Sequence, residues 1–238
     1  MERMDGRKYD QLRPVEFKPG YVDYPEGSVL IAAGNTRVLC NVTVEDSVPS
    51  WMEQNQIPGG WITAEYALLP RSTHTRVSRE TDGLSGRTQE IRRLIGRSLR
   101  AGFNLAEIGP RTCIVDCDVL QADGGTRTAA VTGGYAALAI ALRDLVEAGE
   151  IPSSAFLPPV AAVSVGLVEG QPLLDLSYQE DSAAGVDLNV VLNREGQFIE
   201  VQGTAEGTPF SRGSLDRLID LAEVGIGKLL SLQQEFLE

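Results

Sequence analysis

The chain has 238 residues, of which 42% are hydrophobic, and it carries a formal net charge of −12. This length and apolar content are enough to bury a core as one large domain or as two small lobes. The acidic balance excludes a general nucleic-acid coat, and we find neither an apolar run long enough to cross a bilayer nor a signal peptide at the start. We therefore expect a cytoplasmic protein with no membrane partner.

The first half of the chain alternates strand and helix signals. Apolar runs and helical spacing predict two strands around Gly34-Asn35 within 28–44, a strand at 64–70, a polar loop at 71–86, a helix over 87–103 and a strand at 112–120. In the strand at 112–120, Cys113, Val115 and Cys117 share one face. A long helix should then run over about 127–147 and end before Gly149 and Pro152.

The second half repeats this order without detectable sequence identity to the first. We expect hairpins over 161–178 and 186–203 and an amphipathic helix over 214–237, capped by Ser211 or Ser214. Strand groups followed by helices, twice over, predict an α+β fold with sheets and helices segregated. Because no Ser/Pro-rich linker interrupts the chain, we expect one domain, 1–238, with pseudo-repeat lobes at about 1–150 and 151–238.

The cysteines and the histidine exclude some kinds of site. The chain has three cysteines, Cys40, Cys113 and Cys117, and one histidine, His74. An odd number of cysteines, two of them inside one strand, is typical of buried free thiols in a reducing compartment. A single histidine provides neither a Cys/His zinc site nor, from its place in an arginine-rich loop, a Ser-His-Asp triad.

Positive charge is concentrated in one segment of this acidic chain. Segment 71–100 contains eight arginines and three acidic residues, a net charge of +5, which leaves −17 for the rest of the chain. Arginine is well suited to bidentate contacts with phosphate. Arg71, Arg76 and Arg79 lie in a loop with little to pack against, which favours a nucleic-acid role for them. Arg93, Arg97 and Arg100 are better explained as a solvated helix face or a subunit contact.

The run GGTRT at 124–128 connects a predicted strand to a predicted helix. Glycines allow the backbone to approach a ligand closely, and the free N–H groups at a helix start favour an anion. Arg127 opposes the usual preference for acidic residues in a first helical turn, and an anion bound between Gly125, Thr126 and Arg127 would offset it. The plain alternative is a tight turn capped by Thr126, with Arg127 on the surface.

Arg87 adds to the case for an anion. On a helical wheel it falls on the face of Ile91 and Leu94, one turn earlier, so it points toward the fold and needs a partner. That partner is either a carboxylate or a phosphate shared with Arg127.

Two aspartates stand between predicted strands, in the stretch SYQEDSAAGVDLN. Asp181 and Asp187 could hold Mg²⁺ next to a phosphate site, where the metal neutralises charge during displacement at phosphorus. The alternative is that both are solvated loop acids without a function.

Several long stretches together resemble the ribonuclease PH family of bacterial phosphate-dependent exoribonucleases. They run nearly from end to end: RMDGRKYDQLRPV (3–15), GWITAEYALLPRSTHTR (60–76), SGRTQEIRRLIGRSLR (85–100), DCDVLQADGGTRTAA (116–130), DLSYQEDSAAGVDLNVV (175–191) and EVQGTAEGTPFSR (200–212). The resemblance implies two βαβ-type lobes in one subunit and a homohexamer built as a trimer of dimers.

The resemblance also implies the reaction and the residues that carry it. Inorganic phosphate, as co-substrate, attacks the last phosphodiester of an RNA 3′ end, as in tRNA precursors, and releases a nucleoside diphosphate. The matching residues are Arg87, Gly125, Thr126 and Arg127 for phosphate, Asp181 and Asp187 for catalysis and Mg²⁺, and Arg71, Arg76 and Arg79 for tRNA.

Two other functions remain open at this point. The chain could be a non-catalytic RNA-binding ring subunit of the same fold, but Arg87, Arg127 and both aspartates are retained. It could also be a phosphorylase of small nucleosides, but the arginine loop at 71–79 would then have no purpose.

Overall fold

The computed structural model describes residues 3–238, so the first two residues of the expected domain and first lobe lie outside its description. Its strands form one sheet in the order β1-β2-β3-β5-β4 and a second in the order β7-β6-β8-β9. The first sheet consists of β1 (Val15–Pro19), β2 (Gly27–Ala33), β3 (Thr36–Glu45), β4 (Trp61–Leu68) and β5 (Thr112–Gln121). The second consists of β6 (Val160–Val168), β7 (Gln171–Leu174), β8 (Val186–Asn193) and β9 (Phe198–Ala205).

Five α-helices and two short 3₁₀ turns complete the part that the structure describes. The helices are α1 (Ser50–Gln54), α2 (Gly86–Arg100), α3 (Thr126–Glu147), α4 (Tyr178–Ala183) and α5 (Arg212–Leu237), and the turns lie at Leu105–Glu107 and Ser153–Ala155. In the first sheet β4 runs parallel to β5, with α2 in the connection between them, and the other strand pairs are antiparallel. The second sheet is antiparallel throughout.

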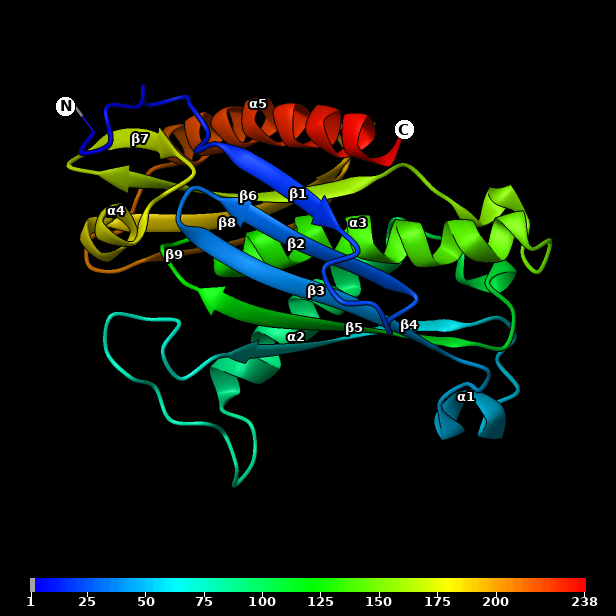
Figure 1. Ribbon diagram of the computed structural model, residues 1–238. Helices are drawn as coiled ribbons and strands as arrows, with labels where there is room; N and C mark the ends of the chain where they lie inside the picture. Colours follow the sequence, from blue (N-terminus) through cyan, green and yellow to red (C-terminus); the bar gives the residue numbers. More distant parts are fainter. Residues whose placement is uncertain (1–2) are drawn as a thin grey trace.

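The alternating side chains of β6 show how the layers stack. Ala161, Val163 and Val165 pack in one apolar cluster with α5, whereas Val160 and Ala162 pack in another cluster with α2, α3 and the first sheet. Helices α2 and α3 therefore lie between the two sheets, and α5 covers the outer face of the second sheet (Figure 1). Most β6 residues are buried because both faces of this strand are covered.

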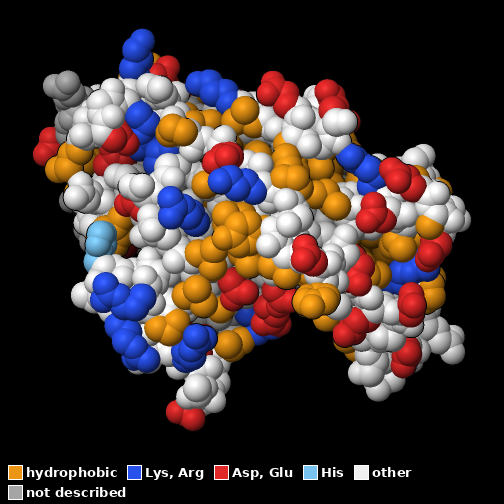
Figure 2. Space-filling view, viewed as in Figure 1, with side chains coloured by type: hydrophobic (Ala, Val, Ile, Leu, Met, Phe, Trp, Pro, Cys, Tyr) orange, Lys and Arg blue, Asp and Glu red, His pale blue; other side chains and the backbone are white. Residues whose placement is uncertain are grey.

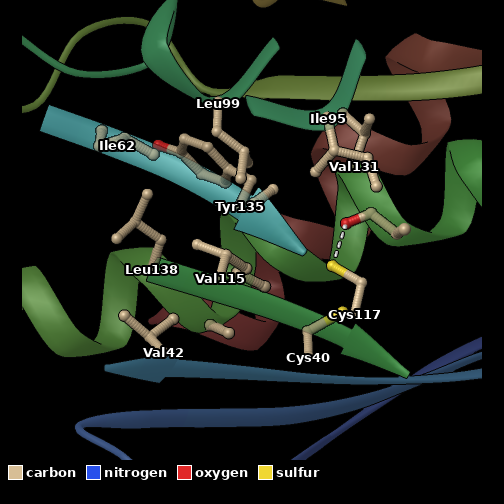
Figure 3. Packing of buried hydrophobic residues seen from close by; sticks show 14 of the residues in the cluster. Cys40, Val42, Ile62, Ile95, Leu99, Val115, Cys117, Val131, Tyr135 and Leu138 are labelled. Atoms are coloured by element: carbon tan, nitrogen blue, oxygen red, sulfur yellow. Dashed lines mark hydrogen bonds between the residues drawn. The ribbon is translucent and has the colours of Figure 1, made fainter. Parts of the chain in front are cut away.

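The centre of the core is the contact of α2 and α3 with β3 and β5. Figure 3 shows it: Ile95, Leu99, Val131, Tyr135 and Leu138 of the helices lie over Cys40, Val42, Val115 and Cys117 of the strands. As expected, the three cysteines are buried free thiols, and burial raises the pKa of Cys113 to about 12. Helix α3 is long and apolar enough to span a membrane by length and composition alone, but 72% of its most apolar window is buried inside the protein, which is typical of a core helix.

The α+β class and the longer elements match the expectations from sequence. The expected strand at 112–120 corresponds to β5, the helix over 127–147 to α3, and the last helix is α5 with Ser211 as its N-cap. Three short elements were not expected: β1, α1 and α4. None is longer than six residues, so none contains enough turns or alternations to give a periodic signal.

Candidate functional site

A cavity of about 610 Å³ lies where the start of α3, the α4–β8 connection and the loop after β4 meet. Its lining contains all six residues expected to handle phosphate, metal and catalysis: Arg87, Gly125, Thr126, Arg127, Asp181 and Asp187. These residues come from α2, α3 with its preceding turn, α4 and β8. The fold thus gathers in one place residues that are up to 100 positions apart in the chain.

The two-glycine turn brings backbone to the wall of this cavity. Gly124 and Gly125 both have positive φ, 77° and 64°, and a Cβ on Gly124 would lie 2.4 Å from the carbonyl oxygen of Leu176. Gly125 is the N-cap of α3, and no side chain among the described residues caps the helix there. The alternative in which Thr126 is the cap is therefore wrong. The first N–H groups of α3 are left for a ligand.

Arg127 is held by two neighbours at the edge of the cavity. Its Nη1 donates to Oε1 of Gln202 at 2.9 Å and lies 3.5 Å from Oε2 of Glu90. The Nε2 group of Gln202 in turn donates to Oε1 of Glu90 at 3.0 Å. A carboxylate thus offsets part of the charge of Arg127, and the contacts fix its guanidinium at the start of α3.

Arg87 is more exposed than its place on the helical wheel suggested. Its side chain is exposed, yet it lines the cavity. No hydrogen bond or ion pair joins this side chain to another residue of the described chain, so the carboxylate that was one of its two possible partners is not found there. Its guanidinium is free to contact an anion in the cavity.

Asp181 and Asp187 form the acidic side of the same cavity. Burial, and secondarily the charge of Asp187, raise the pKa of the Asp181 carboxyl above its ordinary value. A cation between them would relieve this repulsion. Within residues 3–238 no group of three or more His, Cys, Asp or Glu side chains is placed to hold a metal. Two carboxylates nevertheless suit Mg²⁺, which commonly takes one or two carboxylates and fills its shell with water and substrate phosphate.

Helix α4, which carries Asp181, is held by contacts that sequence reasoning missed. Ser177 and Glu180 form a capping box, and Glu180 also pairs with buried Arg3, with both N···O distances at 2.7 Å. The pattern Ser-x-x-Glu at 177–180 is a recognised signal for a helix start and could have predicted α4. The partner Arg3 is 177 positions away, and no local pattern indicates it.

A second buried arginine joins the two sides of the cavity from behind. Arg13 pairs with Asp175 through Nε–Oδ2 at 3.0 Å and Nη2–Oδ1 at 2.6 Å. It also donates to the backbone carbonyls of Asp123 and Gly124. Arg13 therefore ties the glycine turn, on the anion side, to the strand end that leads into α4 and Asp181.

The arginine loop lies beside the cavity. Arg71, Arg76 and Arg79 are all exposed on the connection between β4 and α2, as expected. Thr73, His74 and neighbouring residues of this loop line the cavity, whereas Arg71 lines an adjacent hollow of about 1030 Å³. Figure 2 shows Lys and Arg side chains gathered next to the single histidine on this face.

The remaining arginines of α2 differ in part from the expectation of a solvated face. Arg93 and Arg97 are both exposed, as expected. Arg97 nevertheless forms a double hydrogen bond with Glu200 of β9, and partly buried Arg100 stacks 4.4 Å above the ring of Trp61. These two side chains connect elements of the same chain.

Comparisons with known proteins identify the family of the chain. Residues 11–143 match the 3′ exoribonuclease family, domain 1, and residues 158–225 match domain 2 of that family. Ribonuclease PH of Cyanothece sp. is 55% identical over 236 residues, covering 99% of this chain and 98% of that protein. Ribonuclease PH of Moorella thermoacetica is 55% identical over 239 residues, covering 100% and 95%.

Solved structures agree at the level of the fold. The Archaeoglobus fulgidus exosome with RNA bound to the active site has a chain that superposes with a TM-score of 0.81 at 23% identity, over 99% of this chain and 92% of that one. Rice Rrp46 gives a TM-score of 0.79 at 19% identity, over 99% of both chains. With two matched family domains and more than half of its residues identical to full-length relatives, the chain belongs to the ribonuclease PH branch of the 3′ exoribonuclease family.

Proposed function

We propose that the chain is a phosphorolytic 3′→5′ exoribonuclease that trims the 3′ ends of tRNA precursors in the cytoplasm. The observation that carries this proposal is the single cavity in which an anion-binding helix start and Arg87 face a pair of carboxylates. The near full-length identity to ribonucleases PH supports the same function.

Inorganic phosphate binds on the anion side of the cavity. The open N–H groups at the start of α3, the hydroxyl of Thr126 and the guanidinium groups of Arg87 and Arg127 line this side. Phosphate suits them because it accepts several hydrogen bonds and carries the charge that both arginines and the helix dipole attract. The site thereby holds the nucleophile, one anion, against the phosphodiester, a second anion, and offsets their repulsion.

The reaction exchanges one bond to phosphorus for another. An oxygen of the bound phosphate forms a bond to the phosphorus of the last phosphodiester, and the bond from that phosphorus to the 3′ oxygen of the preceding nucleotide breaks. The 3′ oxygen takes a proton and stays on the shortened RNA as a hydroxyl, while the terminal nucleotide leaves as a nucleoside diphosphate.

Asp181 and Asp187 serve the leaving side of this exchange. Mg²⁺ held by ionised Asp181 would neutralise charge that develops on the phosphoryl oxygens. Asp187, on β8 in the lining of the same cavity, would act from its protonated form as the general acid for the leaving 3′ oxygen, and in its ionised form as a second carboxylate for the metal.

RNA reaches the cavity along the arginine loop, where Arg71, Arg76 and Arg79 bind its phosphates. Their exposure and their place beside the cavity support this path.

We also propose that the subunits form a homohexamer, a trimer of dimers. Exposed aromatic residues such as Tyr21 and Tyr24 offer apolar surface for such contacts, and light scattering would give the mass of the assembly.

The alternative is a non-catalytic RNA-binding ring subunit of the same fold. The experiment that separates the two uses 3′-labelled RNA incubated with and without phosphate, followed by identification of the released nucleotide. The proposal predicts nucleoside diphosphate, and only when phosphate is present. Nucleoside monophosphate released without phosphate would show hydrolysis, and RNA that is bound but never shortened would favour the ring subunit.

A further inference from the structure

A buried tyrosine touches the phosphate side of the cavity. Tyr66 on β4 is 5% exposed, and its hydroxyl lies 2.8 Å from Oγ1 of Thr126, the first residue of α3. Both side chains line the cavity. The proposed reaction assigns no role to the hydroxyl of Tyr66.

The direction of this hydrogen bond follows from what the cavity would hold. Phosphate oxygens at neutral pH mainly accept hydrogen bonds, so a hydroxyl that binds them must donate its proton. A threonine hydroxyl has one proton to donate and two lone pairs that accept. If Thr126 donates to phosphate, its oxygen is free to accept a hydrogen bond, and Tyr66 is the neighbour that lies within reach to donate it.

We propose that Tyr66 is a positioning residue that donates to Thr126 and thereby directs the Thr126 hydroxyl proton toward the phosphate. This inference rests on the proposed phosphorolytic function. It adds to that function a residue that orients the Thr126 hydroxyl, which donates a hydrogen bond to phosphate. The β4 strand places Tyr66 firmly, because its neighbours in the parallel pairing are residues of β5 in the core of the first sheet.

The surroundings of Tyr66 favour the protonated hydroxyl, which is the form that can donate a hydrogen bond. Burial raises the pKa of Tyr66 above its ordinary value, although Thr126, Arg87 and Arg127 act in the opposite direction. The phenol therefore keeps its proton throughout the neutral range. A buried donor of this kind also has a fixed direction, because it has few other partners to turn toward.

The test compares Tyr66→Phe with Tyr135→Phe in the intact assembly. Tyr135 is a second buried tyrosine of the same core, it lies outside the lining of the cavity, and its loss controls for removing a buried phenol hydroxyl. We expect Tyr66→Phe to raise the KM for phosphate about three- to tenfold, the worth of one neutral hydrogen bond, with the KM for RNA unchanged. Tyr135→Phe should leave both constants near wild type.

Two further variants make the proposal specific to Thr126. Thr126→Ser keeps the hydroxyl and should lose much less phosphate affinity than Thr126→Ala, which removes it. In the Thr126→Ala background, adding Tyr66→Phe should cause no further loss, because the group that Tyr66 directs is gone. Additive losses in the double variant would show that Tyr66 contacts phosphate directly and would overturn the proposal.

Direct phosphate binding, measured by calorimetry without RNA, separates failure of this inference from failure of the proposed function. If the wild type neither binds phosphate nor depends on it, the proposed function is wrong. If the wild type does both and Tyr66→Phe binds phosphate equally well, only the role of Tyr66 is wrong. A Tyr66→Phe protein that loses RNA affinity and thermal stability together would indicate a purely structural residue.

Discussion

Asp181 is an exposed residue of the cavity lining, and its carboxyl is close enough to Asp187 for the two charges to repel each other. Partial desolvation and this repulsion raise its pKa above the ordinary value, and a bound cation would act in the opposite direction. Because only the ionised form binds a metal, lowering the pH through this raised pKa should weaken magnesium binding before ordinary carboxylates are protonated. If Asp181 holds magnesium as proposed, the magnesium concentration needed for half-maximal activity should rise as the pH falls, and a concentration that stays constant with pH would contradict this role.

Replacing the aspartates by asparagines tests their roles. Asp187→Asn keeps the shape but removes the titratable carboxyl, which can hold a metal when ionised or give up a proton when protonated, so we expect turnover to fall by about 100-fold or more while RNA binding persists. Asp181→Asn should be rescued in part by added magnesium if its role is confined to the metal. Steady-state phosphorolysis across a magnesium titration measures both. Normal rates for both variants would mean that the two are solvated acids without a role.

Arg87 and Arg127 should matter for phosphate and not for RNA. Arg87→Ala or Arg127→Ala removes a charge-assisted contact that strengthens as the reaction proceeds, at a cost on the order of 2–4 kcal/mol in the barrier, or about 30- to 900-fold in rate. Arg93→Ala is the matched control, because Arg93 is an exposed arginine of the same helix outside the cavity. Equal phosphate kinetics in Arg87→Ala and Arg93→Ala would remove Arg87 from the site.

The candidate phosphate-binding and acidic residues could be predicted from the sequence, but the distant residues that contact them could not. The Gly-Gly-Thr-Arg run and the two aspartates stand out in the sequence because glycines, an arginine and carboxylates occur where a turn or a helix start is expected. The contacts of Arg127 with Gln202 and Glu90 depend on the approach of β9 to α2. Gln202 and Glu90 are 112 positions apart, and no sequence pattern predicts a contact over that separation.

Among the elements, the loop between β4 and α2 carries the clearest expectation for RNA. Substituting Arg71, Arg76 and Arg79 by alanine should weaken RNA binding and lower the slope of log affinity against log salt by about two units, because each lost contact with single-stranded phosphate contributes about 0.7. An Arg212→Ala/Arg217→Ala variant, at two exposed positions of α5, removes charge elsewhere and should keep the slope. If both variants behave alike, RNA does not follow the loop.

The N-terminal segment before β1 stabilises the site through Arg13. In Arg13→Met, buried Asp175 keeps only the longer contact with Arg7, at 3.4 Å, which should lower the free energy of unfolding by about 3 kcal/mol at neutral pH. Adding Asp175→Asn should restore part of that loss, because the poorly compensated carboxylate is gone. Chemical denaturation of the three proteins measures both effects.

The same pair predicts how this loss depends on pH. Burial alone would raise the pKa of Asp175, but the hydrogen bonds and charge of Arg13 outweigh it and hold the pKa below its ordinary value. A lowered folded-state pKa gives stability that is present above the unfolded value, about 3.9, and is lost as the pH falls through the folded value. The difference between wild type and Arg13→Met should therefore shrink in acid. A difference that stays constant with pH would contradict the ion pair.

Long elements could be predicted from the sequence because their periodicity repeats, and short ones could not. In β5, buried and less buried residues alternate along a strand of ten residues, and α3 has 22 residues. Strand β1 has only five residues, of which two, Val15 and Phe17, are partly buried. Helix α4 exists because Arg3 holds Glu180 and a capping box starts it, so its stability comes from the tertiary fold.

For the whole molecule, the central layer of helices determines how it unfolds. Helix α3 packs on β2 and β3 of the first sheet and on β6 of the second, so its loss would expose one apolar face of each sheet, while α5 still covers the other face of the second sheet. We propose that residues 1–238 unfold as one unit in spite of their two lobes. Calorimetry at fixed protein concentration should show one transition with equal calorimetric and van't Hoff enthalpies. Two separate transitions would mean independent lobes.

The origin of the new bond to phosphorus tests the account most directly. RNA is incubated with the enzyme, Mg²⁺ and radiolabelled inorganic phosphate, and the released nucleotides are separated and counted. Phosphorolysis in the cavity between α3 and Asp187 predicts that the label appears in the β-phosphate of nucleoside diphosphates, in equal amount to the nucleotides removed. Unlabelled nucleoside monophosphates from the same RNA would show that water is the nucleophile and would contradict the proposed role of this cavity.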